Sequence, residues 1–184
     1  MSRFDLTFTP LAGLVVVQRK RVQDHRGFFS RFFCADELKS AGFELPVAQV
    51  NHTLTTRRGA VRGLHFQHPP DSEDKFVSCL HGEIFDVAVD LRRGSPTFLQ
   101  WHGEVLSADN ARSLMIPQGF AHGFQALTDN CELLYLHSRY YVAQAEGALN
   151  VNDPRLDISW PLQFTDISAR DSGHAFIPHD FNGI

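Results

Sequence analysis

The amino-acid sequence predicts an all-β fold of the jelly-roll type, with small helices at its periphery. Turn signals recur about every eleven residues, and short segments rich in β-branched and aromatic residues lie between them, as is typical of sandwiches and barrels. Only residues 35–41 (ADELKSA) favour a helix, and Gly42 follows them as a helix-ending residue. We therefore expect one β-rich domain spanning all 184 residues.

The N-terminal part of the chain contains two expected strands. Leu14–Val17 is a β-branched run closely followed by three basic residues, which indicates an edge strand. A turn is expected at residues 24–27 (DHRG), and Phe28–Phe33 should form the next strand. Because an exposed apolar edge invites pairing with another chain, we expect a homodimer.

The clearest strand is Ile84–Leu91, where apolar residues alternate with aspartates. One face should hold Phe85, Val87, Val89 and Leu91, and the other Asp86, Ala88 and Asp90. Such alternation predicts a strand whose first face packs in an apolar layer.

The stretch Arg62–Gln67 (RGLHFQ) also reads as a strand. Simple alternation places Val61, Gly63, His65 and Gln67 on one face and Arg62, Leu64 and Phe66 on the other. Glycine leaves space beside His65, so this imidazole should face a polar cavity. There it could act as a base, a metal ligand or a phosphate contact, and a hydrogen-bonded structural histidine is the alternative.

Composition limits the partners of this chain. Hydrophobic residues make up 43% and charged residues 21% of the sequence, as in ordinary globular domains. A net charge of −4 leaves no basic excess, so we expect no nucleic-acid partner. No apolar run reaches the ~20 residues that span a bilayer, so no membrane partner is expected.

Cysteine usage indicates a compartment. Cys34, Cys79 and Cys131 form no CxxC pair, and each lies in an apolar run, as buried free thiols of a reducing cytosol do. Residues 1–13 also show no basic region followed by an apolar core, so no secretory leader is expected. The sequence predicts a cytoplasmic protein.

Several short motifs follow one another along the chain. They are Asp24-x-Arg26-Gly27-Phe28-Phe29, Gln49-x-Asn51, Arg62–Gln67, Gly82–Asp90, Ile116–Phe124, Asn152-Asp153-Pro154 and Ser168-Ala169-Arg170-Asp171. Together they resemble the dTDP-4-dehydrorhamnose 3,5-epimerase family of the cupin superfamily, over roughly residues 5–178. The resemblance implies a cupin-like jelly-roll homodimer, free of any cofactor, that acts on a nucleotide-linked 4-keto-6-deoxyhexose such as a dTDP-sugar.

This chemistry needs a base, an enolate stabiliser and an acid on the opposite face of the sugar, because the 4-keto group acidifies the protons at C3 and C5. The resemblance implies that His65 is the base and that Asp171 orients it. It implies that Tyr135 is the acid and that Lys75 is the cation near the keto oxygen. Taken alone, Lys75 could equally be a solvated surface lysine.

Substrate contacts are expected at further positions. Arg26, Arg62 and Arg170 are candidates for the diphosphate, because guanidinium groups bind phosphate oxygens in a bidentate manner. The resemblance implies that Gln49, Asn51, His122 and Glu146 line the substrate site and that Tyr141 stacks on the thymine. On one strand, Tyr135 and Tyr141 would lie ~20 Å apart and could touch only opposite ends of the substrate; two barrel-wall aromatics are the alternative.

Two positions depart from the family pattern. Arg31 stands where the family usually has an acidic residue, and Arg170 stands where it often has lysine. These changes leave the base intact, but they leave open the nucleotide, the sugar and the carbon that is inverted.

Three other functions are alternatives to this interpretation. A metal-dependent cupin would require a His-x-His pair, whereas His65 is followed by Phe66-Gln67-His68, so no metal is expected. A non-catalytic sugar-nucleotide binding protein would not need His65, Tyr135 and Asp171 together. A sugar-nucleotide 3,4-ketoisomerase remains an alternative within the enzyme class.

Overall fold

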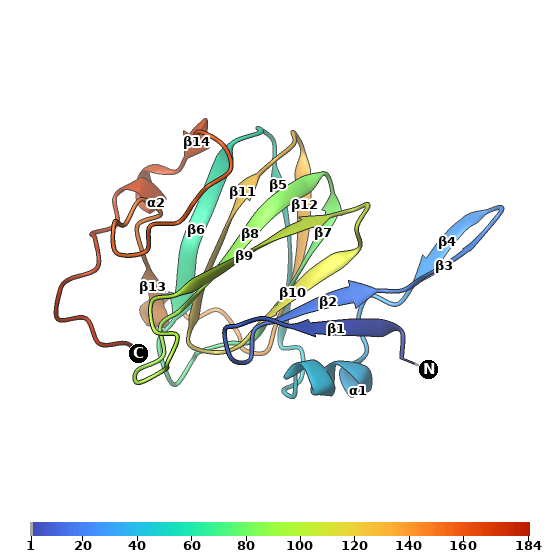
Figure 1. Cartoon of the computed structure of the whole chain (residues 1–184), viewed down its shortest axis with the longest axis horizontal. Coiled ribbons are helices and arrows are strands. Elements are labelled where there is room, and N and C mark those ends of the chain that lie inside the picture. The colour runs from blue at the N-terminus through green and yellow to red at the C-terminus, as the bar shows by residue number, and fades with distance from the viewer. Residues whose placement is uncertain (1) are drawn as a thin grey trace.

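The computed structural model describes residues 2–184 and confirms the predicted all-β jelly roll, in which two largely antiparallel sheets pack face to face (Figure 1). In spatial order the first sheet contains β1 (Phe4–Phe8), β2 (Val15–Arg19), β10 (Arg112–Ile116), β7 (Lys75–His81), β12 (Cys131–His137) and β5 (Gln49–Thr55). The second contains β13 (Glu146–Ala148), β6 (Ala60–Gln67), β11 (Phe120–Ala126), β8 (Glu83–Asp90) and β9 (Trp101–Ser107), and β14 (Asp166–Ile167) pairs in parallel with the start of β6.

Helices are short and peripheral. The predicted helix is present as α1 (Ala35–Leu38) and the 3-10 turn η1 (Lys39–Ala41), and Gly42 ends it with a φ of 95°. The 3-10 turn η2 (Ala143–Ala145) and the helix α2 (Ala169–Ser172) lie in the C-terminal part. No helix in residues 2–184 is long and apolar enough to cross a membrane.

Three apolar layers stabilise the barrel. Leu114, Phe120, Phe124 and Leu133 belong to the layer between the sheets. Leu38 and Phe43 cover the outer face of the first sheet. Leu149, Val151, Leu156 and Ile177 of the C-terminal tail cover the outer face of the second. Each fully buried side chain of this size contributes ~1.5–3 kcal/mol to folding.

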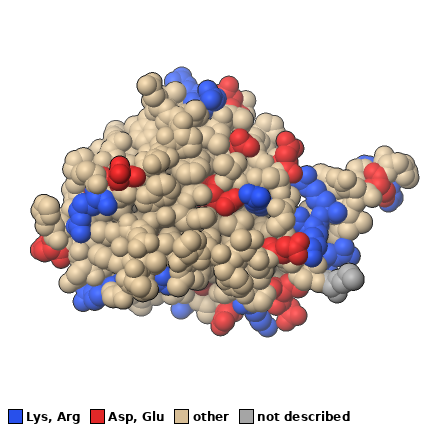
Figure 2. Space-filling model, viewed as in Figure 1, with Lys and Arg blue, Asp and Glu red and all other residues tan. Residues whose placement is uncertain are grey.

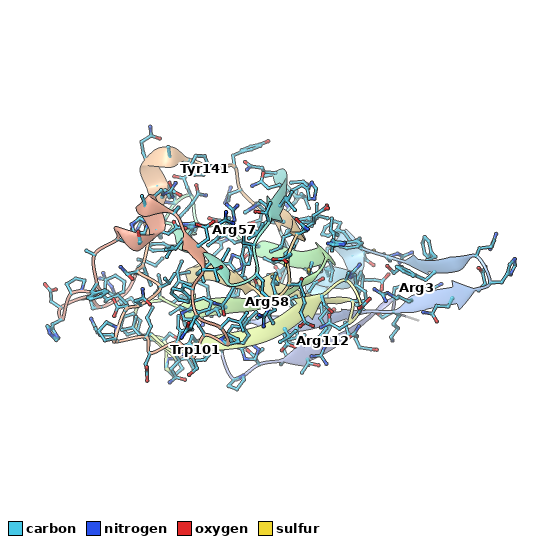
Figure 3. The ribbon with its side chains drawn as sticks, turned by 90° about the horizontal axis from the view of Figure 1, so that it is seen from above. Arg3, Arg57, Arg58, Trp101, Arg112 and Tyr141 are labelled. Carbon is cyan, nitrogen blue, oxygen red and sulfur yellow. The ribbon has the colours of Figure 1, made fainter. Side chains whose placement is uncertain are left out.

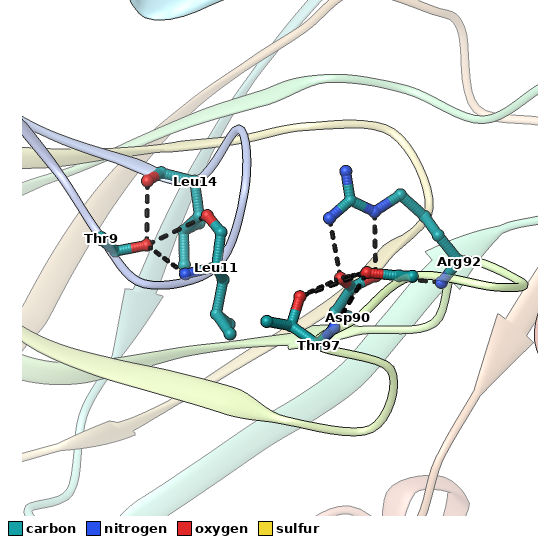
Figure 4. A network of polar contacts seen from close by, with 7 residues as sticks. Thr9, Leu11, Leu14, Asp90, Arg92 and Thr97 are labelled. Atoms are coloured by element: carbon teal, nitrogen blue, oxygen red, sulfur yellow. Dashed lines mark hydrogen bonds and ion pairs between the residues drawn. The ribbon is translucent and has the colours of Figure 1, made fainter.

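The prediction for β8 is confirmed. Val87 and Val89 pack against the C-terminal tail, while Ala88 faces the layer between the sheets. Asp90, at the end of β8, is fully buried and accepts hydrogen bonds from Arg92, Ser95 and Thr97 (Figure 4). This carboxylate therefore fixes the loop that follows β8.

Two N-terminal expectations are wrong in part. Leu14–Val17 comprises the first three residues of β2 and the residue before it. β2 is an inner strand, because it pairs with β10 on one side and with β1 on the other. The strand expected over Phe28–Phe33 ends at Ser30 and belongs to β4 (Gly27–Ser30), which pairs with β3 (Arg21–Asp24). This β3–β4 hairpin projects from the barrel (Figure 1).

The hairpin exposes three large apolar side chains, because Val22, Phe28 and Phe29 are all at least half exposed. Figure 2 shows Lys and Arg side chains gathered where the hairpin leaves the barrel, while charges of both signs are scattered over the rest of this face. Neighbouring apolar side chains that stay exposed are costly to leave in water and are typical of interaction surfaces.

Candidate active site

A cavity of about 620 Å³ lies between the two sheets. The first sheet contributes Gln49, Asn51, Lys75 and Tyr135, the second contributes Arg62, His65, His122 and Glu146, and later segments contribute Tyr141 and Asp171. Ten of the twelve residues predicted for the site thus line one cavity, and Arg26 and Arg170 do not. Tyr141 lies on the side of the barrel away from Trp101 and Arg112 (Figure 3).

A bulge in β6 decides which side chains enter this cavity. On β11, His122 and Phe124 are two residues apart, but their partners on β6, His65 and Arg62, are three apart. The extra residue shifts the alternation, so Arg62 lines the cavity together with His65, and Val61 lines it while also packing in the outer layer. The simple alternation that placed Arg62 on the face opposite His65 is therefore wrong, and the bulge that Arg62 requires for a diphosphate contact is present.

His65 and Asp171 form the first of two histidine–carboxylate pairs. His65 Nε2 lies 2.8 Å from Asp171 Oδ1, and the Gly63 amide donates to Asp171 Oδ2 at 3.3 Å. Asp171 is buried in the first turn of α2, where Ser168 Oγ accepts its backbone N–H. Burial lowers the pKa of His65, and the hydrogen bond to Asp171 opposes that shift. His65 is thus held as a neutral base at pH 7, with Nδ1 as its free nitrogen.

His122 and Asp86 form the second pair. His122 Nε2 lies 2.8 Å from Asp86 Oδ1, and both side chains are buried. His122 and His65 are directly paired on neighbouring strands, so the two imidazoles enter the cavity side by side. Burial raises the pKa of Asp86, and the adjacent His122 opposes this.

Tyr135 comes from the opposite sheet. Its ring makes an edge contact with His122 at 6.0 Å between centroids and stacks on His137 at 6.1 Å. Burial and, after it, the charge of Asp86 raise the pKa of Tyr135 above its ordinary value of 10.0. The phenol is therefore a proton donor across the cavity from His65.

Lys75 is not a solvated surface lysine. Its side chain is buried and forms an ion pair with Glu73, which also accepts a hydrogen bond of 3.0 Å from Gln67. A buried ammonium group paired in this way supplies a fixed positive charge in the cavity.

The nucleotide-facing candidates form a connected group. Tyr141 donates its hydroxyl to Glu146 at 2.9 Å and its backbone N–H to Gln49 at 3.0 Å, and Gln49 donates to Asn51 at 3.1 Å. The expectation that Tyr135 and Tyr141 share a strand is wrong, because β12 ends at His137 and the chain turns away. The strand spacing therefore does not apply to them.

The two arginines outside the cavity differ in position. Arg170 is exposed and pairs with Glu146 at the cavity edge. Arg26 lies at the turn of the β3–β4 hairpin and pairs with Asp24 at 2.5 Å. Arg31, the departure from the family pattern, pairs with Glu37 of α1.

Sequence reasoning missed several lining residues, among them Thr53, Arg57, Glu73, His137 and Arg139. Alternation along β5 and β12 could have found Thr53 and His137, which are two residues from Asn51 and Tyr135. Burial, with Lys75 nearby, lowers the pKa of His137 to about 4, so it lines the cavity as a neutral imidazole. His174 was also missed, and with His65 and Asp171 it forms a group of three possible metal ligands.

The chain is similar to known proteins over nearly its whole length. The family model of dTDP-4-dehydrorhamnose 3,5-epimerase matches residues 8–178. The enzyme of that name from Shigella flexneri is 39% identical over 175 residues, which cover 94% of this chain and 96% of the relative. The Bacillus anthracis dTDP-4-dehydrorhamnose 3,5-epimerase, with TDP and PPi bound, has a TM-score of 0.91 at 35% identity and covers 95% of this chain and 99% of that one. A Legionella pneumophila dTDP-6-deoxy-D-glucose-3,5-epimerase, in complex with dTDP-4-keto-L-rhamnose, has a TM-score of 0.87 at 39% identity, with 92% and 90% covered.

Proposed function

The chain belongs to the dTDP-4-dehydrorhamnose 3,5-epimerase family and is a carbohydrate epimerase of the isomerase class, and from this premise we propose how its cavity inverts a dTDP-linked 4-keto-6-deoxyhexose. The observation that carries the proposal is the pair formed by His65 and Asp171 opposite the partly buried Tyr135. A base and an acid that face one cavity from two sheets suit removal of a proton from one face of a sugar and its return to the other.

In the first step, His65 Nδ1 removes the proton at C3 or C5, next to the 4-keto group. Nε2 donates to Asp171, and its carboxylate stabilises the imidazolium that forms. The electron pair left on carbon moves into the carbonyl to give an enolate.

Lys75 and His122 stabilise the enolate oxygen. Lys75 carries a fixed positive charge whose buried partner is Glu73, and His122 is oriented by Asp86. Donors that are already in place cost no reorganisation when the negative charge develops.

In the second step, Tyr135 returns a proton to the opposite face of the carbon. Solvent then takes the proton from His65 and restores the phenol of Tyr135, so both groups are ready for the next turnover. The raised pKa of Tyr135 keeps the phenol protonated at the start of each turnover. The same two groups serve C3 and C5, because the outcome depends only on how the ring lies between them.

The nucleotide occupies the part of the site that Tyr141 lines. We assign the thymine to Tyr141, with Gln49, Asn51 and Glu146 in the group bonded to it. Arg62 and Arg170 then bind the diphosphate, because their guanidinium groups lie inside the cavity and at its edge.

Arg26 contributes to the site of a second subunit in this proposal. Its hairpin carries it away from its own cavity and exposes Val22, Phe28 and Phe29, which a partner would cover. The protein then works as a homodimer, in the cytoplasm, where its three free thiols stay reduced. Light scattering should give a dimer mass, and a monomer mass at micromolar concentration would contradict the assignment of Arg26.

One experiment tests the function itself. The protein is incubated with dTDP-4-keto-6-deoxyglucose in deuterated water, and C3 and C5 are followed by NMR. Deuterium at one or both carbons, with inversion there, is the expected result. A 3-keto product would indicate the ketoisomerase alternative, and no exchange would indicate a binding protein.

A further inference from the structure

Three side chains with metal-binding atoms converge beside the proposed base. In the described part of the chain, the ligand atoms of His65, Asp171 and His174 all lie within 4.8 Å of one another. His65 Nε2 is 2.8 Å and His174 Nε2 is 4.0 Å from Asp171 Oδ1. The three residues come from β6, α2 and the segment just after α2. His65 is far from Asp171 and His174 in the sequence, so no short sequence motif contains all three residues.

His174 takes no part in the proposed reaction, yet its imidazole is directed at the same carboxylate. Its Nε2 is buried and has no hydrogen-bond partner. Its backbone is fixed, because Asn150 Nδ2 donates to the His174 carbonyl at 2.8 Å. A buried polar nitrogen that has no hydrogen-bond partner is costly unless something binds it.

The spacing of the three ligands suits a small transition-metal ion. Bonds of about 2.0–2.2 Å to nitrogen and oxygen in a tetrahedral site place neighbouring ligand atoms about 3.3–3.6 Å apart. The observed spacings of 2.8 and 4.0 Å lie on either side of this value. The His174 ring lies outside any strand and has a quarter of its surface exposed, so it is free to make the adjustment.

Resting on the function proposed above, we propose that His65, Asp171 and His174 bind a divalent ion of the Zn²⁺ class and that this ion inhibits the epimerase. As a base, His65 carries its proton on Nε2, which donates to Asp171, and accepts the substrate proton on Nδ1. A metal bound to Nε2 takes the lone pair of that nitrogen, and the ring proton moves to Nδ1. Nδ1 then has no lone pair to accept a proton, so metal binding and base function exclude each other.

The donor set determines which ions bind. Two imidazoles and one carboxylate suit Zn²⁺, Co²⁺ and Ni²⁺, whereas Mg²⁺ and Ca²⁺ prefer oxygen ligands. Three protein ligands leave a fourth position open to water from the cavity, which His65 lines. The nearby charge of Arg170 is balanced by its ion pair with Glu146, so it does not repel a cation strongly.

The test uses the full chain, purified without a histidine tag and freed of metal with a chelator. Co²⁺ is added first without substrate, and its visible absorption reports tetrahedral nitrogen–oxygen coordination. Zn²⁺ is then titrated into the deuterium-exchange assay, with Mg²⁺ as the control ion. We expect one Co²⁺ per chain, loss of exchange in step with Zn²⁺ occupancy, recovery with EDTA and no effect of Mg²⁺.

Two matched variants decide the outcome. His174→Gln should keep the deuterium-exchange activity. It should weaken Co²⁺ and Zn²⁺ binding by about 100-fold, because even the loss of a residue that only supports a metal ligand can weaken binding by that factor. His179→Gln removes an exposed histidine of the same tail and should change neither. The proposed metal site would be refuted if His174→Gln bound Co²⁺ as tightly as the unsubstituted protein and were inhibited equally by Zn²⁺.

The inhibition is refuted separately if the Zn²⁺-loaded protein exchanges deuterium at full rate. A failure of the proposed function is distinguishable from both results, because the Co²⁺ spectrum is measured without substrate and does not depend on His65 being the base.

Discussion

Gly63 should be indispensable because it permits the bulge that brings Arg62 and His65 to one face. Its φ is +130°, and an added Cβ would lie 2.5 Å from Gly123 Cα and 3.0 Å from the His122 carbonyl oxygen. Carbon contacts are ordinarily about 3.5 Å or longer, so β6 and β11 would have to part by about 1 Å. We predict that Gly63→Ala disrupts both stability and catalysis.

The magnitude follows from two costs. Holding an L-residue at this φ costs ~1–3 kcal/mol, and overpacking against backbone costs ~1–3 kcal/mol more. Gly63→Ala should therefore lower the free energy of unfolding by roughly 2–6 kcal/mol. At about 2–4 °C per kcal/mol for a chain of this size, Tm should fall by roughly 4–24 °C.

Denaturant and thermal unfolding measure this change, with Gly94→Ala as the control. Gly94 also has a positive φ, of +74°, but a Cβ there would meet nothing within 4 Å. Gly94→Ala should thus cost only the conformational part, ~1 kcal/mol. If Gly63→Ala were no less stable than Gly94→Ala, the argument that close contact between β6 and β11 sets the bulge would be refuted.

Three further predictions concern the cavity. Asp171→Asn removes the partner that raises the pKa of His65, so the acid limb of the kcat/KM profile should move to lower pH. The rate should also fall, but by less than it does when His65 itself is removed. An unshifted pH–rate profile would contradict this coupling. Lys75→Met leaves Glu73 buried without its cation and should lower the free energy of unfolding, measured in urea, by ~3–5 kcal/mol. The double variant with Glu73→Gln should regain stability but not activity. Recovery of activity as well would show that Lys75 is structural. Tyr135→Phe should retain hydrogen exchange at one carbon in NMR while net inversion fails, and full inversion would exclude it as the acid.

Much of the fold was predictable from local pattern. The alternation in residues 84–91 predicts β8 and its faces because period-2 patterning is local to one strand. The helix before Gly42 is likewise a local signal. Whether β2 is an edge strand depends on β1, and no local pattern in Leu14–Val17 carries that information.

The site was predictable in composition but not in geometry. The bulge depends on a contact between Gly63 and Gly123, on two strands that are far apart in sequence. Tyr141 reaches the cavity because β12 ends at His137, and strand spacing cannot reveal such a turn. His174 meets Asp171 only because Asn150 and the Ser168 cap fix the segment around α2.

The proposed reaction depends on His65 as the base, and removal of its imidazole tests this role. His65→Ala is incubated with dTDP-4-keto-6-deoxyglucose in deuterated water, and deuterium at C3 and C5 is followed by NMR beside a nucleotide-binding measurement. Loss of a positioned base should slow exchange by ~10²–10⁴ at both carbons, while dTDP binding stays largely intact. Near-full exchange in His65→Ala would contradict the account and make His65 a structural histidine.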